Sequence, residues 1–325
     1  MDCVIPSHLV RPFCSAIGCL SRVGKELYID FDPIEGLTLR ALNDAKSVFG
    51  SFHYEPAFFQ RCTSPPLPGK RRASQASQDD RWSVRLACKA LSAVVRPRKN
   101  VMSLRLQSSE NSLSFEFQLQ KQASMVRVVH RIGVADAQGV AAVAPKDGCS
   151  EMVVNPQVLL RMLEPLKTTA EIALIVNDQH KLVSAVTFHH DDFQKENDAA
   201  NVLTKPAALK TETSIGTNDL LEYEYQDFAD LDCDNDPLPP PDTLREQVLL
   251  VFTIKEFKAM LQFCAQAYAD QELRVRLSFY WGGKPMVVET SAEGFSGQIV
   301  MATLDHKLLG AMKQMSSGEL GRDQE

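Results

Sequence analysis

The sequence predicts an α+β protein in which helices cover one face of antiparallel sheets and the chain forms two similar halves. One observation is that a unit of one amphipathic helix followed by three strands recurs four times along the 325 residues. Another is that the segment 133–150 lacks a clear period and separates the second unit from the third, as a connector would. The repeat lies in the order of the elements and not in residue identity, and each helix has an apolar stripe to bury against a sheet.

The fourth unit shows the pattern most clearly. Thr253 precedes an apolar helical run and Glu256 follows three residues later, which predicts a capping box at the start of this helix. The apolar stripe consists of Ile254, Phe257, Leu261, Cys264 and Tyr268. A strand at Gln247–Phe252 is expected before the helix, and the three expected after it are Glu272–Tyr280, Lys284–Thr290 and Phe295–Ala302.

The first three units follow the same order. In the first, a helix at Ser7–Leu20 is followed by strands at Glu26–Phe31, Gly36–Asn43 and Val48–Tyr54. In the second, a strand at Trp82–Leu86 and a helix at Cys88–Arg96 precede strands at Val101–Gln107, Leu113–Gln120 and Met125–Ile132. In the third, Asn155 is the expected N-cap of a helix that Pro156 opens and Pro165 closes, and strands follow at Ala170–Val176, Leu182–Phe188 and Ala207–Thr213.

The chain is long enough for two domains with cores of their own. We expect an N-terminal domain at 1–132, a connector at 133–150, a C-terminal domain at 151–305 and a short polar tail at 306–325. Two insertions interrupt this plan. A basic, Pro- and Ser-containing loop is expected at about 63–80, and an acidic, Pro-rich segment at about 222–242.

Composition restricts the class of protein. With 44% apolar and 23% charged residues the chain is typical of a water-soluble fold, and no apolar run approaches the length of a membrane span. The N-terminus shows no secretory signal pattern. The eight cysteines occur singly, without a CxxC pair, and several fall at apolar helix positions, so we interpret them as reduced core residues of an intracellular protein.

The net charge of −6 is unevenly distributed. Seven acidic residues lie between 222 and 236 without a Lys or Arg among them, and they account for the negative balance. The helices carry cations on their polar sides, so a basic surface is compatible with an acidic chain. Two interpretations stay open: these cations line a concave surface that binds a polyanion, or they are the solvated sides of amphipathic helices.

Four blocks of sequence resemble a known family. They are SRVGKELYIDFDPIEGLTLRALND (Ser21–Asp44), PAFFQRC (Pro56–Cys62), FTIKEFKAMLQFC (Phe252–Cys264) and FSGQIVMATLD (Phe295–Asp305). With the fourfold repeat of a helix and three strands, the chain resembles the sliding clamps of DNA replication, PCNA and its relatives. Within these, the blocks are similar to the Rad-nine subunit of the nine-one-one DNA-damage checkpoint clamp. The resemblance covers about residues 1–305 without the two insertions.

The resemblance implies a DNA-clamp fold and a nuclear subunit of a heterotrimeric ring. We expect neither enzymatic activity nor a cofactor, although exonuclease activity has been ascribed within the family. The partners of the subunit would be the Rad-one and Hus-one subunits, a clamp loader, double-stranded DNA, checkpoint kinase activators and repair enzymes. Helices would line the hole, where cations contact phosphates without reading sequence. The residues expected to face DNA are Arg11, Lys89, Arg96, Arg98, Lys99, Arg161, Lys255 and Lys258.

The resemblance also implies two kinds of protein-binding surface. Neighbouring subunits would pair with edge strands through Met125, Arg127, Val129, Arg131, Leu209, Thr211 and Thr213. Partner peptides would dock under the connector, in a pocket formed by Leu42, Asp44, Val134, Val140, Ala302 and Leu304. For the edge strands, the alternative is that both are ordinary strands inside a sheet.

Two features of the sequence bear on phosphorylation. The family usually carries a long Ser/Thr-rich C-terminal tail, and here about twenty residues follow Leu304. The insertion contains Arg71, Arg72 and Ser74 in an R-R-x-S order that basophilic kinases recognise. Phosphorylation of Ser74 would add about −1.5 to −2 charge. The alternatives for this stretch are a solvated basic loop and a nuclear-import patch.

Two other functions stay open at this point. A self-trimerising processivity clamp of the PCNA type would need its own edge strands to complement each other. A metal-dependent 3′–5′ exonuclease would use the run His189-His190-Asp191-Asp192. Consecutive residues of a strand point to opposite sides, so this run is a poor arrangement for convergent metal ligands.

Overall fold

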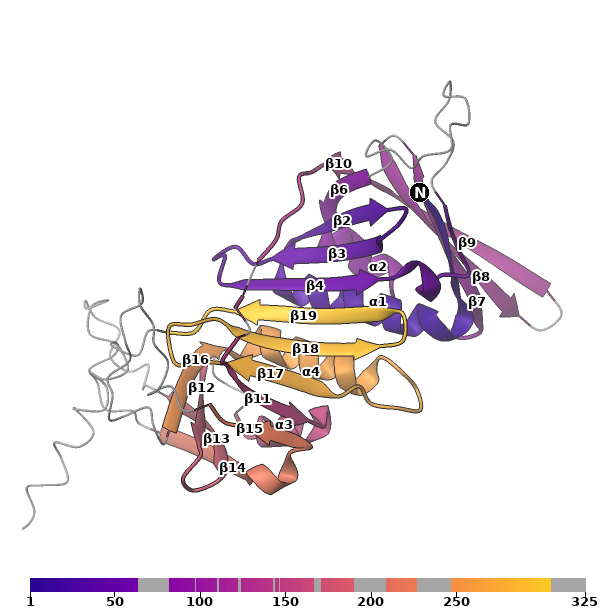
Figure 1. Ribbon diagram of the computed structural model, residues 1–325. Coiled ribbons are helices and arrows are strands. Elements are labelled where there is room, and N and C mark those ends of the chain that lie inside the picture. Colours follow the sequence, from indigo (N-terminus) through magenta and orange to yellow (C-terminus); the bar gives the residue numbers. More distant parts are fainter. Residues whose placement is uncertain are drawn as a thin grey trace, which may run out of the picture. The chain divides into compact units, whose positions relative to one another are not determined.

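The computed structural model describes residues 1–63, 82–96, 98–109, 111–121, 124–142, 144–145, 147–166, 171–189, 209–226 and 247–304 (Figure 1). The first compact unit comprises Met1–Val143, Ala259–Val275 and Val288–Val300, and the second comprises Ala144–Lys258, Arg276–Val287 and Met301–Glu325. Each unit contains several separate segments of the chain and not one continuous stretch. The domain boundaries at 132, 150 and 305 therefore stay a prediction. Within the described residues, no helix has the length and apolar character needed to cross a membrane.

The described residues form four α-helices: α1 (Ser7–Val23), α2 (Cys88–Val94), α3 (Pro156–Met162) and α4 (Ile254–Gln266). Each begins at or within two residues of its predicted start. The first is one turn longer than expected, because Val23 is buried and the amide of Gly24 donates to the carbonyl of Leu20 (3.0 Å). Helices and antiparallel sheets confirm the predicted α+β class.

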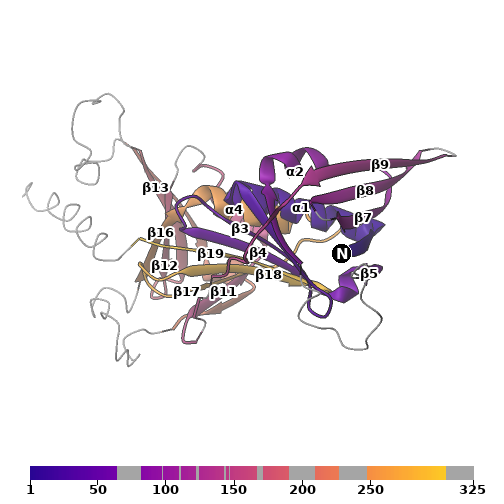
Figure 2. The same cartoon turned by 90° about the horizontal axis from the view of Figure 1, so that it is seen from above.

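In the first unit, seven strands lie side by side in the order β10-β6-β2-β3-β4-β19-β18. Their bounds are Ala135–Asp136, Trp82–Ala87, Glu26–Asp32, Gly36–Leu42, Val48–Tyr54, Phe295–Met301 and Met286–Ala292. Helix α1 packs on β3 and β4 and against α2, on one side of this sheet (Figure 2). Strand β2 buries Leu27, Ile29 and Phe31 in the alternating pattern of a half-covered sheet.

An aromatic core explains why C-terminal segments belong to this unit. Phe263 of α4 packs edge-on against Phe52 of β4, with ring centroids 4.7 Å apart, and it also contacts Phe295 of β19. Tyr54 of β4 contacts the rings of Phe13 and Phe295. Such rings supply much of the apolar area that a core buries.

A second sheet of the first unit has five strands in the order β5-β1-β7-β8-β9. Their bounds are Arg61–Thr63, Asp2–Pro6, Val101–Ser109, Ser112–Lys121 and Ser124–Gly133. The sequence predicted β7, β8 and β9 but neither β1 nor β5. Both are short, so neither contains enough residues to show a clear alternation.

A disulfide bond joins Cys3 of β1 to Cys62 of β5, and the two residues are also register partners in the sheet. The interpretation of all eight cysteines as reduced is therefore wrong for this pair, because strand pairing brings together two residues 59 positions apart. Cys14, Cys19, Cys88, Cys149 and Cys264 are free thiols. Of these, burial raises the pKa of Cys264 to about 12, which keeps the thiol neutral.

The second unit contains a four-stranded sheet in the order β14-β13-β12-β16. Its strands are Leu209–Gly216, Leu182–His189, Glu171–Asn177 and Gln247–Thr253. Helix α3 contacts β14, and as predicted Asn155 caps this helix through its side-chain oxygen, which accepts from the amide of Gln157 (2.9 Å). Thr213 of β14 donates from its hydroxyl to the carbonyl of Met162 (2.7 Å).

The remaining strands of the second unit are β11 (Ser150–Val154), β15 (Glu222–Glu224) and most of β17 (Val275–Phe279), in the order β17-β11-β15. Glu222–Glu224 was placed in the acidic insertion by its charge. It forms a strand because Tyr223 pairs with Met152 of β11 and its hydroxyl donates to the carboxylate of Asp178 (3.0 Å).

The predicted capping box of α4 is wrong. Thr253 is the last residue of β16, and its hydroxyl oxygen has no hydrogen-bond partner among the described residues. One carboxylate oxygen of Glu256 is likewise without a partner there, and the residue is buried. The spacing matched the motif, but the side-chain bond of Thr253 is not formed, and this residue is instead paired with Glu171 at the end of β16.

Candidate functional sites

The eight cations expected to face DNA are distributed over both units. Arg11, Lys89, Arg96, Arg98 and Lys99 lie in the first unit, and Arg161, Lys255 and Lys258 lie in the second. All are exposed except Arg98 and Lys258, which are partly buried. Exposure on helices or just beyond them is compatible with phosphate contact, and the contact itself stays a prediction.

The structure brings two predicted polar helix faces together inside the first unit. Arg11 of α1 donates from Nε to the carbonyl of Gln266 at the end of α4 (3.0 Å). Arg22 of α1 donates from Nη1 to the side-chain oxygen of Gln262. Both bonds are exposed, so two guanidinium groups of α1 lie beside polar groups of α4 at the surface of the first unit.

Sequence reasoning missed Arg22. It lies eleven residues after Arg11, which is three turns of an α-helix and therefore the same face. The predicted helix ended at Leu20, so Arg22 was placed outside it. The i, i+11 spacing was the signal that would have identified this residue.

Arg98 is held by the protein itself. Its guanidinium carbon lies 4.1 Å from the centre of the Phe117 ring, and Nη2 lies 2.8 Å from Nε2 of His130. It also donates to the carbonyl of Val94 near the end of α2. Burial, followed by the nearby Arg98 charge, lowers the pKa of His130, so the ring is neutral at pH 7 and its Nε2 accepts. Any phosphate contact by Arg98 therefore competes with these contacts.

Lys258 is similarly engaged in the second unit. Its ammonium group donates to the carbonyl of Leu163, just after α3 (3.0 Å). A cation at a helix C-terminus stabilises the exposed carbonyl groups there. Lys255, three residues earlier on α4, is exposed, as is Arg161 on α3.

The strands expected at subunit contacts lie at sheet edges in the described part of the chain. Strand β9 ends the five-stranded sheet, and β14 ends the four-stranded sheet. Exposed and partly buried residues alternate along β9. The four residues predicted on this strand all lie on its exposed face: Met125, Arg127, Val129 and Arg131. Edge strands offer unpaired backbone groups to another chain, but their use between subunits stays a prediction.

The side chains of β14 differ from those of β9. Thr211 and Thr213 are partly buried, and Thr213 is bonded to Met162. The backbone of Leu209 pairs opposite His189. Contact through this strand would therefore use its backbone and the exposed Lys210 and Glu212 more than the predicted threonines.

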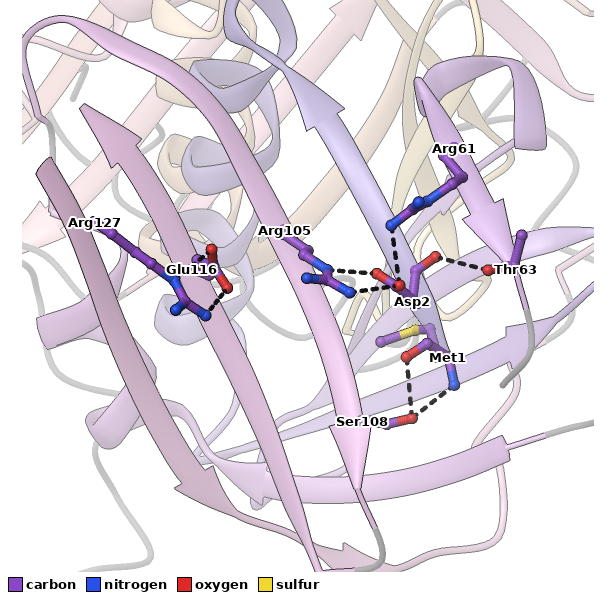
Figure 3. Close-up of polar contacts among 8 residues, drawn as sticks. All are labelled: Met1, Asp2, Arg61, Thr63, Arg105, Ser108, Glu116 and Arg127. Atoms are coloured by element: carbon purple, nitrogen blue, oxygen red, sulfur yellow. Dashed lines mark hydrogen bonds and ion pairs between the residues drawn. The ribbon is translucent and has the colours of Figure 1, made fainter. Parts of the chain in front are cut away.

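The outer face of the five-stranded sheet carries a row of alternating charges, the charge ladder, shown in Figure 3. Asp2 of β1 accepts from Arg61 of β5 (3.1 Å) and from two nitrogens of Arg105 of β7 (both 2.8 Å). Arg105 is the register partner of Glu116 of β8, which accepts from Nε (2.6 Å) and Nη2 (2.7 Å) of Arg127 of β9. The ladder thus crosses all five strands.

The charge ladder shifts the acidity of its carboxyl groups. Hydrogen bonds from Arg105 are the main reason why the pKa of Asp2 lies below its usual range. Those from Arg127 do the same for the pKa of Glu116, which is only 8% exposed. Both carboxylates are ionised at neutral pH, and the bidentate geometry fixes their orientation.

The residues expected to form a partner-peptide pocket fall in different units. Leu42, Val134 and Val140 are partly buried in the first unit, where Asp44 is exposed and paired with Lys25. Ala302 and Leu304 are exposed in the second unit, and the amide of Leu304 donates to the carbonyl of Val251 (3.0 Å). The pocket therefore stays a prediction.

Four predicted features lie outside the described residues. They are Ser74 with its basic neighbours, residues 227–242 of the acidic insertion, His190 to Asp192 of the proposed metal run, and the C-terminal tail. Among the side chains that are described, no group of three or more His, Cys, Asp or Glu is placed to hold a metal ion. The exonuclease hypothesis is thus neither supported nor tested by the fold.

Solved structures define the class of this fold. PCNA from Thermococcus kodakaraensis matches with a TM-score of 0.62 and 14% identity, over 93% of this chain and 99% of that chain. PCNA from Entamoeba histolytica matches with a TM-score of 0.61 and 10% identity, over 94% of this chain and 98% of that chain. The chain therefore has the PCNA-like clamp fold.

The family follows from sequence comparison. The Rad9 family model matches residues 13–304. A curated relative, the cell cycle checkpoint control protein Rad9 of Drosophila melanogaster, is 20% identical over 295 residues, which cover 90% of this chain and 54% of the relative. The chain belongs to the Rad9 family and spans about half the length of that relative.

Proposed function

We propose that this chain is a subunit of a heterotrimeric, ring-shaped checkpoint clamp that is loaded on DNA at damage or stalled forks. The observation that carries the proposal is a match to the Rad9 family over most of a chain with the PCNA-like fold. In this proposal the other two subunits are Rad-one and Hus-one, a clamp loader opens the ring, and the complex acts in the nucleus. The assembled ring recruits checkpoint kinase activators and repair proteins.

DNA contact is assigned to the polar sides of the helices. The exposed surface formed by Arg11 and Arg22 of α1 with Gln262 and Gln266 of α4 supports this assignment. Guanidinium and amide groups bind phosphate oxygens without reading bases, which suits a ring that slides along DNA.

Assembly is the decisive test of this function. Light scattering gives the mass of the chain alone and after mixing with the Rad-one and Hus-one subunits. A complex of three different chains supports the proposal. A stable trimer of this chain alone replaces it with a self-trimerising processivity clamp, and a monomer indifferent to both partners overturns it.

A pair of matched variants locates the contact. Met125 on edge strand β9 is 61% exposed, and Ile34 at the turn between β2 and β3 is 71% exposed. Met125→Asp is expected to reduce the fraction of assembled complex, because a charge replaces an apolar group at the proposed contact. Ile34→Asp introduces the same charge away from either edge strand and should assemble normally.

A further inference from the structure

Edge strand β9 differs in charge from edge strand β14. Strand β9 (Ser124–Gly133) contains the cations Arg127 and Arg131 and has neither Asp nor Glu. Strand β14 contains Lys210 and Glu212, whose charged atoms lie 2.8 Å apart, so its charges are balanced within the strand. The cationic edge therefore has no complement in β14, the other strand expected at a subunit contact.

The charge ladder shows what a strand beside β9 would meet. Along Arg61, Asp2, Arg105, Glu116 and Arg127, each strand presents the sign opposite to that of its neighbour. The row ends on a cation at the edge. A strand added to β9 continues the alternation only if it presents an acidic group there.

A second cation extends this requirement along the strand. Arg131 lies on the same exposed face as Arg127, four residues away, which is about 13 Å in an extended strand. It is exposed and forms no hydrogen bond or ion pair with another described residue. Val129, 39% exposed, lies between the two cations on this face. The complementary strand thus has two acidic residues four positions apart with an apolar residue midway between them.

Pairing of this edge with the same edge of a second copy is disfavoured. It would place the cations of one strand among those of the other, and like charges opposite each other destabilise a sheet. Pairing with β14 of a second copy offers a single carboxylate, Glu212, and would bring Lys210 beside the cations of β9 as well.

We infer that β9 selects, as its neighbour, an extended strand of the pattern acidic-x-apolar-x-acidic from a different chain. This inference rests on the proposed function for the use of the edge and adds the chemistry of the partner strand. The backbone supplies the pairing, and Arg127 and Arg131 supply the choice among strands.

Synthetic strands test the inference with the full chain. Three fluorescein-labelled peptides of about ten residues alternate valine with threonine and carry Glu, Lys or Thr at the two positions four residues apart. Binding is followed by fluorescence anisotropy at low and high salt. We expect the Glu peptide to bind about tenfold more tightly than the Lys peptide, with a difference that decreases at high salt. Equal affinities for all three would overturn the inference.

Variants and hydrogen exchange locate the effect. Arg131→Glu changes a residue without described partners, so the fold is expected to persist while the preference between the Glu and Lys peptides decreases or reverses. Lys210→Glu, the matched change on β14, should leave the preference intact. Bound Glu peptide should slow amide exchange in 124–133, and protection elsewhere without protection there would contradict the assignment.

One further peptide tests whether the occupant is a different chain. A peptide of residues 227–236 of this protein, which contains five acidic residues, is compared with the Glu peptide. Equal or tighter binding would place the partner strand within this chain and overturn the inference of a different one.

The peptide experiments do not require that the chain is assembled into a ring, so they test the inference separately from the proposed function. A preference for acid without assembly of three chains would count against the proposed function only, and assembly that ignores the charge of residue 131 would count against this inference only.

Discussion

Removal of the bond between Cys3 and Cys62 should destabilise the first unit and not the second. The bond closes a loop between residues 59 positions apart. In the chain-entropy account, a crosslink that closes a loop of about 60 residues stabilises the folded state by about 4 kcal/mol, because it restricts the unfolded chain. Cys62→Ser should therefore lower the free energy of unfolding of the first unit by up to about 4 kcal/mol.

The two tryptophans of the chain make the assay specific. Trp82 lies in the first unit and Trp281 in the second. A Trp281→Phe background leaves Trp82 as the fluorescent reporter, and urea unfolding is followed with and without a thiol reductant. Reductant should shift the unfolding midpoint of the background protein down to that of its Cys62→Ser variant, and it should not shift the midpoint of the variant itself.

Two outcomes would refute this reasoning. If reductant leaves the midpoint of the oxidised protein unchanged, the bond does not restrict the unfolded chain in the way assumed. If mass spectrometry after alkylation finds both thiols free in the native protein, the bond is not present. Cys88→Ser, a change at a free thiol of the same unit, is the control for effects of losing a cysteine as such.

Three other predictions follow from the described contacts. The low pKa values of Asp2 and Glu116 mean that the charge ladder stabilises the fold at neutral pH, and that this contribution is lost as pH falls below about 4 through the folded pKa. When urea midpoints are measured against pH, the loss of stability in acid should be smaller for Glu116→Gln than for the unchanged protein. An identical pH profile for the two proteins would contradict this. Phe263→Ala should lower unfolding stability by about 3–5 kcal/mol, because the ring is 3% exposed and contacts two other rings; a loss below about 1 kcal/mol in calorimetry would show that the core refills the space. Lys255→Gln in the assembled clamp should lower the slope of log affinity for DNA against log salt by about 0.9, whereas Lys210→Gln should leave the slope unchanged.

Much of the fold could be predicted because its main elements carry periodic signals. The apolar spacing of α1 and α4 and the alternation in β2, β8 and β9 are local properties of the chain. The cap at Asn155 was predicted correctly and the one at Thr253 was not, although both residues precede an apolar helical run. The side-chain oxygen of Asn155 accepts from the amide of Gln157, whereas the hydroxyl of Thr253 is buried without a partner among the described residues, a difference that spacing does not show.

The sequence predicted which residue types form the candidate sites, but it predicted less well which other residues they contact. Exposure of six of the eight cations followed from a position on the polar side of a helix or just beyond one. That Arg98 packs on Phe117 and that Lys258 binds the carbonyl of Leu163 could not be read from spacing, since each partner comes from another element. The same holds for the bond from Arg22 to Gln262, residues 240 positions apart.

The sequence by itself determined the fold class, the positions of four helices and most strands, and the family, because periodicity and four sequence blocks are local. Only the tertiary structure decided which cations serve the fold, which cysteines pair, and how five charges form the ladder from Arg61 to Arg127. These features depend on strand register, and register is set by contacts between residues far apart in the chain, which no local pattern specifies.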